Sequence, residues 1–257
     1  MIQQTDARLA VLIDADNIPK KCLKAVFEEV ALYGTPTIKR IYGDWTRPEL
    51  AGWKNELLEN ALTPIQQYGY TSGKNSTDSA MIIDAMDILY SGRTDGFCIV
   101  SSDSDFTRLA TRLREAGMKV FGFGERKTPN PFIVACDKFL YIEVIMAQPK
   151  TNEQEQAEAP EQESESVKKK AEKQTRGSKE LFNLLSSSIN DLQDEDGWAF
   201  LGELGNLLIK KQPDFDPRNY GYRSLTPLVK SIDQFEIDAR ETNSPHIKHI
   251  YVRNKNK

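Results

Sequence analysis

Several residue types are scarce in this chain of 257 residues, and their scarcity excludes whole classes of protein. The three cysteines, Cys22, Cys98 and Cys136, are far apart and lack C-x-x-C spacing. A disulfide framework is therefore not expected, and a reducing, cytoplasmic location is. Histidine occurs only twice, as His246 and His249, with no third ligand nearby to complete a zinc site.

Long hydrophobic runs and an excess of positive charge are missing as well. No apolar run approaches the roughly 20 residues that a membrane-spanning helix needs. The first residues lack the basic and apolar segments of a secretory signal, so we expect neither a signal peptide nor contact with a membrane. The formal net charge is −4. Any nucleic acid must therefore be held by local basic patches or through metal ions.

Composition divides the chain into three parts. Residues 1–147 alternate apolar runs typical of strands with stretches of helical periodicity. Residues 148–178 contain almost nothing apolar and change from Glu-rich to Lys-rich, which predicts a disordered charged linker. The basic half of this linker is either a solvated tether or an aid in holding phosphates. Residues 179–257 regain apolar periodicity and predict a second, smaller domain.

The first part predicts repeated strand–helix units. Strands are expected at 7–14, 35–44, 63–70, 95–103, 118–124 and 138–144, and helices at 18–34, 49–62, 76–92 and 104–117. Strands that alternate with helices of this length predict an α/β fold with a doubly wound, mainly parallel sheet. The carboxyl ends of parallel strands meet at one edge of such a sheet, which is where ligands bind.

Acidic residues lie at this predicted edge. Asp14 ends the first strand, and Asp103 and Asp105 follow the fourth. Asp78 opens the apolar helix 76–92. Carboxylates that converge repel one another unless cations neutralise them, and hard oxygen ligands select Mg²⁺ or Mn²⁺. Such sites serve phosphodiester hydrolysis, so we interpret these acids as a candidate metal site.

Some acids also have a structural explanation. An Asp at a strand-to-helix junction is often a helix N-cap, and this alternative stays open for Asp16 and for Asp105. Asp84 lies six residues after Asp78, so we expect it to point away from the other acids and to make a structural hydrogen bond.

Basic and aromatic residues near the acids are candidates for RNA contact. Lys74 precedes Asp78 in a polar loop, and Arg47 follows the second strand. Both can hold a phosphate. Trp45 can stack a base or anchor its own loop, and the sequence favours neither.

The order of these residues resembles the NYN domain of PIN-like nucleases, over roughly residues 7–146. The motifs that carry the resemblance are Ile13-Asp14-x-x-Asn17, Lys74-x-x-x-Asp78 and Ser101-x-Asp103-x-Asp105-Phe106. The resemblance implies that Asp14, Asp78 and Asp103 are metal ligands and that Asp105 is a fourth acid. It also implies that Asn17 orients water or substrate.

Residues 179–257 predict a winged helix-turn-helix. Helical periodicity at 178–193, 201–208 and 224–232 is followed by two short strands near 235–237 and 250–253. The motifs Gly197-Trp198, Leu204-Gly205, Phe215-Asp216-Pro217-Arg218-x-Tyr220-Gly221 and Phe235-Glu236 resemble the LOTUS domain, also called the OST-type helix-turn-helix. That resemblance implies RNA binding, and in some members of the family a protein partner.

The residues that contact RNA in this second domain are less sharply defined. The candidates beside the helix after the turn are Arg218, Tyr220, Arg223 and Lys230. Trp198, Phe215 and Phe235 are expected in the core. Residues 179–257 hold 11 Lys and Arg against 12 Asp and Glu. Recognition by shape or stacking therefore fits better than general attraction to phosphates.

Taken together, the sequence predicts a cytoplasmic ribonuclease that uses Mg²⁺ or Mn²⁺ and retains RNA through its C-terminal domain. One alternative is a non-catalytic RNA-binding or regulatory protein. Another is an adaptor that recruits a protein partner through residues 179–257. DNA remains open as a substrate, because metal–carboxylate chemistry is indifferent to the sugar.

Overall fold

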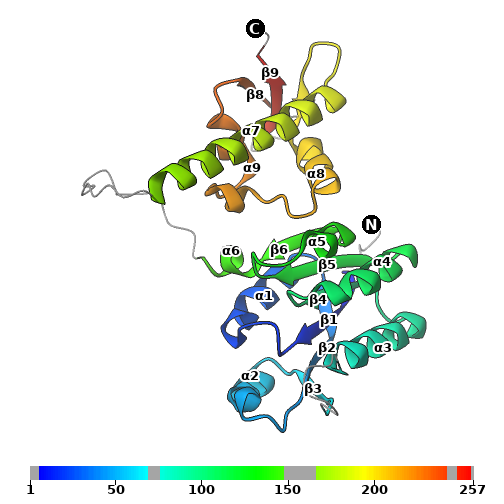
Figure 1. Cartoon of the computed structure of the whole chain (residues 1–257). Coiled ribbons are helices and arrows are strands. Elements are labelled where there is room, and N and C mark those ends of the chain that lie inside the picture. The colour runs from blue at the N-terminus through cyan, green and yellow to red at the C-terminus, as the bar shows by residue number, and fades with distance from the viewer. Residues whose placement is uncertain (1–5, 69–75, 148–165, 242–247, 256–257) are drawn as a thin grey trace. The chain divides into compact units, whose positions relative to one another are not determined.

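The computed structural model describes residues 6–68, 76–147, 166–241 and 248–255. By their internal contacts these residues form two compact units, an N-terminal one that extends to Ala147 and a C-terminal one (Figure 1). Each unit has its own sheet. Among the described residues, none of the helices combines the length and apolar character that crossing a membrane requires.

A parallel sheet of six strands forms the centre of the N-terminal unit. The strands are β1 (Arg8–Asp14), β2 (Thr35–Gly43), β3 (Thr63–Gln66), β4 (Gly96–Val100), β5 (Lys119–Gly124) and β6 (Lys138–Tyr141). Their order is β3-β2-β1-β4-β5-β6, and every neighbouring pair is parallel. The direction of winding reverses between β1 and β4, which makes their carboxyl ends the expected place for a ligand.

Helices cover both faces of this sheet, as predicted (Figure 1). Alternate residues of β1 explain why: Leu9, Val11 and Ile13 pack on one face, and Ala10 and Leu12 on the other. The first face carries α1 (Leu23–Val30), α2 (Lys54–Glu59) and α6 (Ile142–Met146). The opposite face carries α3 (Ser76–Ser91), α4 (Thr107–Glu115) and α5 (Asn130–Ala135).

Two features near the end of this unit differ from the prediction. The strand expected at 138–144 ends at Tyr141, and residues 142–146 form α6. The short helix α5 was not predicted. Short apolar runs fit a strand and a buried helix equally well, so periodicity does not separate them.

The C-terminal unit is a winged helix-turn-helix, which confirms the prediction. It contains α7 (Ser166–Leu192), β7 (Ala199–Phe200), α8 (Leu201–Lys211), α9 (Leu225–Lys230), β8 (Phe235–Glu241) and β9 (Lys248–Asn254). The strands form an antiparallel sheet in the order β7-β9-β8. The two-residue strand β7 was not predicted, because its residues precede a run of helical periodicity.

The predicted linker 148–178 is corrected in its second half. Helix α7 begins at Ser166, so residues 166–178 are helical. The physical reason is continuity with the helix that follows: Lys, Ala, Glu and Gln are good helix formers, and extending an existing helix avoids the cost of a new nucleus. Residues 148–165 lie outside the described part of the chain.

Candidate functional site

Asp14 is held rigidly at the carboxyl end of β1. Its side chain is 0 % exposed and accepts hydrogen bonds from Asn17 Nδ2 at 2.6 Å and from Ser101 Oγ at 2.8 Å. The backbone nitrogen of Asp16 donates a third hydrogen bond at 3.1 Å. Burial raises the pKa of the Asp14 carboxyl, and these hydrogen bonds offset part of the rise. Asn17, predicted to orient water or substrate, therefore orients Asp14 in this structure.

Ser101 connects the ends of the two central strands. Its buried hydroxyl donates to Asp14 after β1 and accepts from the backbone nitrogen of Asp103, at 3.1 Å, after β4. Ser101 appeared in the sequence only as part of a motif, and no role was predicted for it. The available signal was a small polar residue that directly follows a strand with every residue buried.

Asp103 and Asp105 lie at the start of the next helix. Asp103 is the N-cap of a 3-10 turn, Ser104–Phe106, and its Oδ1 accepts from the backbone nitrogen of Asp105 at 2.9 Å. The capping role considered for Asp105 therefore belongs to Asp103. Asp105 lies in the first turn and is exposed. Its carboxylate thus remains accessible to a ligand from solution.

Three of the predicted acids form a cluster. Each of Asp78, Asp103 and Asp105 offers a carboxylate oxygen, and these oxygens lie within 4.8 Å of one another. Asp78 is in the first turn of α3, where the helix dipole favours a negative charge. Among the described residues, Asp14 is not a member of this group. Its charge nevertheless acts on Asp78.

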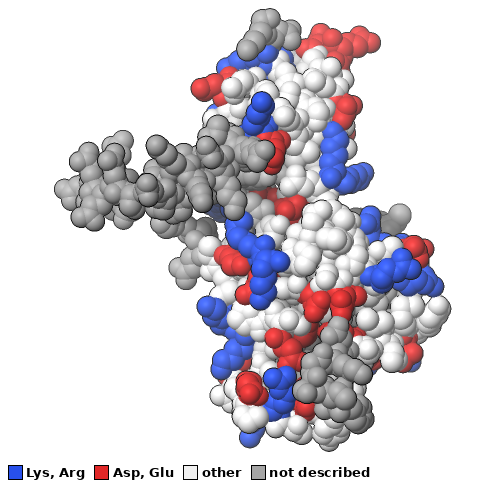
Figure 2. Space-filling model, viewed as in Figure 1, with Lys and Arg blue, Asp and Glu red and all other residues white. Residues whose placement is uncertain are grey.

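The cluster carries uncompensated negative charge. The pKa of Asp78 is raised to about 6, first by burial and then by the charges of Asp14, Asp103, Asp105 and Asp16. Figure 2 shows a face of the molecule on which Asp and Glu side chains gather over the N-terminal unit. Oxygen ligands at this spacing, under mutual repulsion, suit a hard divalent cation.

The rim of the cluster contains one of the predicted basic residues. Asp16 accepts a hydrogen bond from Thr77 Oγ1 at 3.3 Å and pairs with Arg47 at 3.6 Å. Arg47 also pairs with Glu49 at 3.6 Å, so acidic neighbours balance its charge. Thr77 was not predicted. Lys74 lies outside the described residues.

Trp45 and Asp84 both have structural roles. Trp45 packs against the core and donates from Nε1 to the backbone oxygen of Ile65 at 3.0 Å, so it anchors its loop. Asp84 accepts hydrogen bonds from Arg40 and from the hydroxyl of Tyr42, as expected of an acid that points away from the cluster. Burial and the bond to Asp84 raise the pKa of Tyr42.

The candidate RNA contacts of the C-terminal unit differ in how free they are. Arg218 pairs with Asp216 at 2.7 Å, next to the 3-10 turn Pro217–Tyr220. Tyr220 lies in that turn, whereas Arg223 and Lys230 are exposed. All four lie in a different unit from the acid cluster.

The three aromatic residues expected in the core of the C-terminal unit do not share one environment. Phe215 and Phe235 are buried, at 3 % and 5 % exposure, and confirm the expectation. Trp198 is only partly buried and lies between two guanidinium groups, so the expectation is wrong for Trp198.

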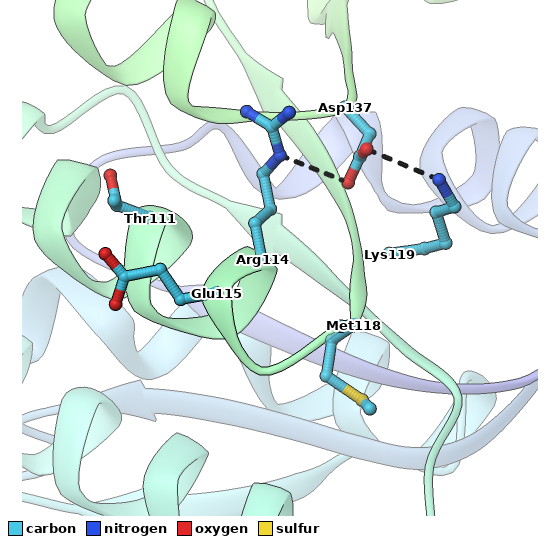
Figure 3. A pocket seen from close by; sticks show the side chains of 7 residues that line it. Thr111, Arg114, Glu115, Met118, Lys119 and Asp137 are labelled. Carbon is cyan, nitrogen blue, oxygen red and sulfur yellow. Dashed lines mark hydrogen bonds and ion pairs between the residues drawn. The ribbon is translucent and has the colours of Figure 1, made fainter.

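A separate cavity of about 410 Å³ lies at the opposite edge of the parallel sheet, where β5 begins. Figure 3 shows Arg114 and Lys119 directed at one carboxylate, that of Asp137, at 3.6 Å and 3.5 Å. Asp137 therefore balances part of the positive charge in this cavity. The cavity has no part in the acid cluster.

Comparisons with known proteins agree with this geometry. The chain matches the family model of the NYN domain over residues 8–143 and that of the OST-HTH/LOTUS domain over residues 173–247. A search of curated proteins found no significant match.

Two solved structures illustrate the similarity. One is a protein of unknown function from Vibrio parahaemolyticus, 21 % identical, with 54 % of this chain and 94 % of that chain covered and a TM-score of 0.44. The other is an uncharacterized protein from Nitrosomonas europaea, 33 % identical over 44 % of this chain and 94 % of that chain, with a TM-score of 0.29.

NYN domains are nucleases and LOTUS domains bind RNA. The NYN match covers more than half of the sequence, and the acids that carry its motif meet at the switch point of the sheet. The chain therefore belongs to the NYN domain family and carries an OST-HTH/LOTUS domain after its NYN domain.

Proposed function

We propose that this protein is a metal-dependent ribonuclease that hydrolyses RNA phosphodiester bonds and retains its substrate through the C-terminal unit. The observation that carries the proposal is the cluster of Asp78, Asp103 and Asp105, within 4.8 Å, at the carboxyl edge of the parallel sheet. We place the two domains at residues 1–147 and 179–257, with α7 leading into the second.

The metal proposed is Mg²⁺ or Mn²⁺. The three clustered carboxylates supply hard oxygen ligands, and their repulsion, seen in the raised pKa of Asp78, is relieved when a cation binds. When bound, such an ion activates water and stabilises the leaving oxygen in phosphodiester hydrolysis.

The surrounding residues fix the ligands and their field. Asn17 and Ser101 fix the Asp14 carboxylate, so its charge acts on the cluster from a constant position. Through its bond to the Asp103 backbone, Ser101 also ties the loop after β4 to the end of β1. We assign Asp14 a part in the site through its charge, as a fourth acid beside the clustered three.

RNA is the proposed substrate because of the C-terminal unit. LOTUS domains bind RNA, and this unit has the winged helix-turn-helix of that family. We propose Arg47 and Lys74 as phosphate contacts near the acids. Arg218, Tyr220, Arg223 and Lys230 are proposed as contacts in the second unit, where a protein partner remains a further possibility to test. Buried free thiols at Cys22, Cys98 and Cys136 support a cytoplasmic location.

Cleavage of labelled single-stranded RNA tests the proposal. Wild type should cut with Mg²⁺ or Mn²⁺ and not with EDTA. Asp14→Asn and Asp103→Asn should each reduce the rate by about 100-fold or more, because the charge of the site is lost. Asp87→Asn is the matched control, since Asp87 is an exposed acid on the same helix as Asp78.

Two outcomes would overturn the nuclease. Absence of cutting by wild type under saturating Mn²⁺ would leave an RNA-binding or adaptor protein as the better account. Cutting that survives both Asp substitutions would place the activity elsewhere. Parallel reactions on DNA of the same sequence measure the preference for the sugar.

A further inference from the structure

The sheet of the C-terminal unit has one face in the core and one face toward solvent. On β9, Val252 is buried, and the residues before and after it, Tyr251 and Arg253, lie on the opposite face. Pairing across the sheet places Phe200 of β7 beside Tyr251, and Arg240 of β8 beside His249. The solvent face therefore combines side chains from all three strands.

This face is rich in rings. We call it the aromatic sheet face and define it by Trp198, Phe200, Arg240, His249, Tyr251 and Arg253. The Phe200 ring lies 5.1 Å from the His249 ring and 5.7 Å from the Tyr251 ring, centroid to centroid. Aromatic side chains on a solvent-facing sheet are unusual, because they gain little stability there, and they commonly indicate binding.

Two guanidinium groups continue the ring system. Arg240 lies over the Tyr251 ring at 4.1 Å and over the Trp198 ring at 5.4 Å. Arg253 lies over the other part of this face, 4.5 Å from the Trp198 ring centroid. The flat groups thus form one continuous set across the three strands, and a guanidinium plane offers a stacking surface in the same way as a ring.

Acidic neighbours hold these guanidinium planes in place. Asp238 pairs with Arg240 at 2.9 Å, and Glu236 pairs with Arg253 at 2.7 Å. All four side chains are between 39 % and 47 % exposed. The pairs cancel in charge, so the face offers flat surfaces with little attraction for a phosphate backbone.

This combination selects among possible ligands. In a duplex the flat surfaces of the bases are hidden, and reading the backbone requires a net positive charge, which is missing here. A protein partner would have to bury two half-exposed ion pairs, which is costly. Unpaired bases suit the face better, because they stack on rings and guanidinium planes and leave the charged edges in water.

We propose that the aromatic sheet face binds the unpaired bases of single-stranded RNA by stacking. The proposal rests on the proposed function in taking RNA as the ligand. It places the binding surface on the sheet, away from the helix-side candidates Arg218, Tyr220, Arg223 and Lys230.

The test measures binding of the full-length protein to a fluorescein-labelled single-stranded RNA of about 12 nucleotides, in EDTA so that nothing is cut. Tyr251→Thr keeps a β-branched residue in the strand but removes the ring. We expect its affinity to fall by about 5- to 150-fold, the range for loss of one stacked base. Tyr251→Phe is the matched control, since it keeps the ring, and should bind like wild type.

Two further measurements separate stacking from simple charge. Wild-type affinity should fall by less than about 10-fold between roughly 50 mM and 200 mM salt, because few phosphates are neutralised. Replacing Arg223 and Lys230 together by Gln should change affinity less than Tyr251→Thr does. If Tyr251→Thr does not fold, Arg240→Lys decides: it keeps the charge, loses the plane, and should bind more weakly.

Several results would overturn the proposal. Equal binding by wild type and by folded Tyr251→Thr would exclude stacking on this face and leave it for a protein partner. A larger loss in the Arg223 and Lys230 variant would move binding to the helix side. Wild type that binds no single-stranded RNA would remove this inference together with RNA retention. The cleavage assay tests the acid cluster separately, so failure of the nuclease is distinguishable from failure here.

Discussion

Asp78 shows how the candidate metal site acts on the stability of the N-terminal unit. Its pKa is raised to about 6 from an ordinary value of 3.8. A carboxyl whose pKa is higher in the folded than in the unfolded state stabilises the fold below the unfolded pKa. That stabilisation is lost as the pH rises through the folded pKa. Without metal, Asp78 therefore weakens the fold near neutral pH.

We expect Asp78→Asn to reverse this effect. In EDTA at about pH 7.5 the variant should be more stable than wild type by about 1 to 2 kcal/mol, and near pH 4 by much less. Thermal unfolding of both proteins between these pH values measures the difference. A difference that stays constant with pH would show that repulsion at Asp78 is not its source. Saturating Mn²⁺ should stabilise wild type more than the variant.

Individual acids were predictable from the sequence, but their roles were not. Asp14, Asp78, Asp103 and Asp105 were selected because acids next to buried strands or at the start of a helix meet at one edge of a parallel sheet. The hydrogen bonds that make Asp103 a cap and Ser101 a link depend on backbone angles at the ends of the strands. Those angles leave no periodic signal in the sequence.

At the scale of single elements, the contact between β5 and β6 depends on a glycine. A Cβ at Gly122 would lie 2.5 Å from Phe139 Cδ2 and 2.8 Å from Cys136 Sγ. Both neighbours are fully buried on the face covered by α3, α4 and α5, so they have little room to move. The missing side chain at position 122 is what allows Phe139 to lie against the sheet.

We expect Gly122→Ala to destabilise the protein by about 1 to 3 kcal/mol, the usual cost of overpacking a core. Gly52→Ala is the control, because its Cβ would meet only the end of the Lys20 side chain, at 3.0 Å. Its effect should be within about 0.5 kcal/mol. Chemical denaturation measures both, and similar values for the two variants would contradict the packing argument.

The elements that the sequence failed to predict share one property: they are short or weakly amphipathic. Helices α5 and α6 have six and five residues, and β7 has two. Elements of this size form because neighbours bury them, and that tertiary effect is invisible to periodicity. The start of α7 was misjudged because charged composition was taken to exclude a helix that its apolar continuation extends.

For the whole molecule, the two units are expected to divide the work. The N-terminal unit contains the acid cluster and its own two-sided core, and the C-terminal unit contains a separate core. A tethered RNA-binding unit raises the local concentration of substrate without altering the chemistry.

A fragment of residues 1–150 therefore should fold cooperatively and keep the kcat of metal-dependent cleavage. Its KM for long RNA should rise by about 10-fold or more, because the second contact is lost. Circular dichroism verifies folding, and steady-state cleavage gives the two constants. Loss of kcat with an unchanged KM would mean that the C-terminal unit takes part in the chemistry and not in retention.

The positions of the three thiols have a practical consequence. Cys22 and Cys98 lie in the core on one side of the parallel sheet, Cys136 lies in the core on the other, and burial raises the pKa of each thiol. The C-terminal unit has no cysteine. Alkylating reagents will therefore label this protein only as its N-terminal layers open, and mass spectrometry of the labelled peptides will time each layer separately. The native sequence thus already carries a site-resolved clock for the unfolding of its nuclease domain.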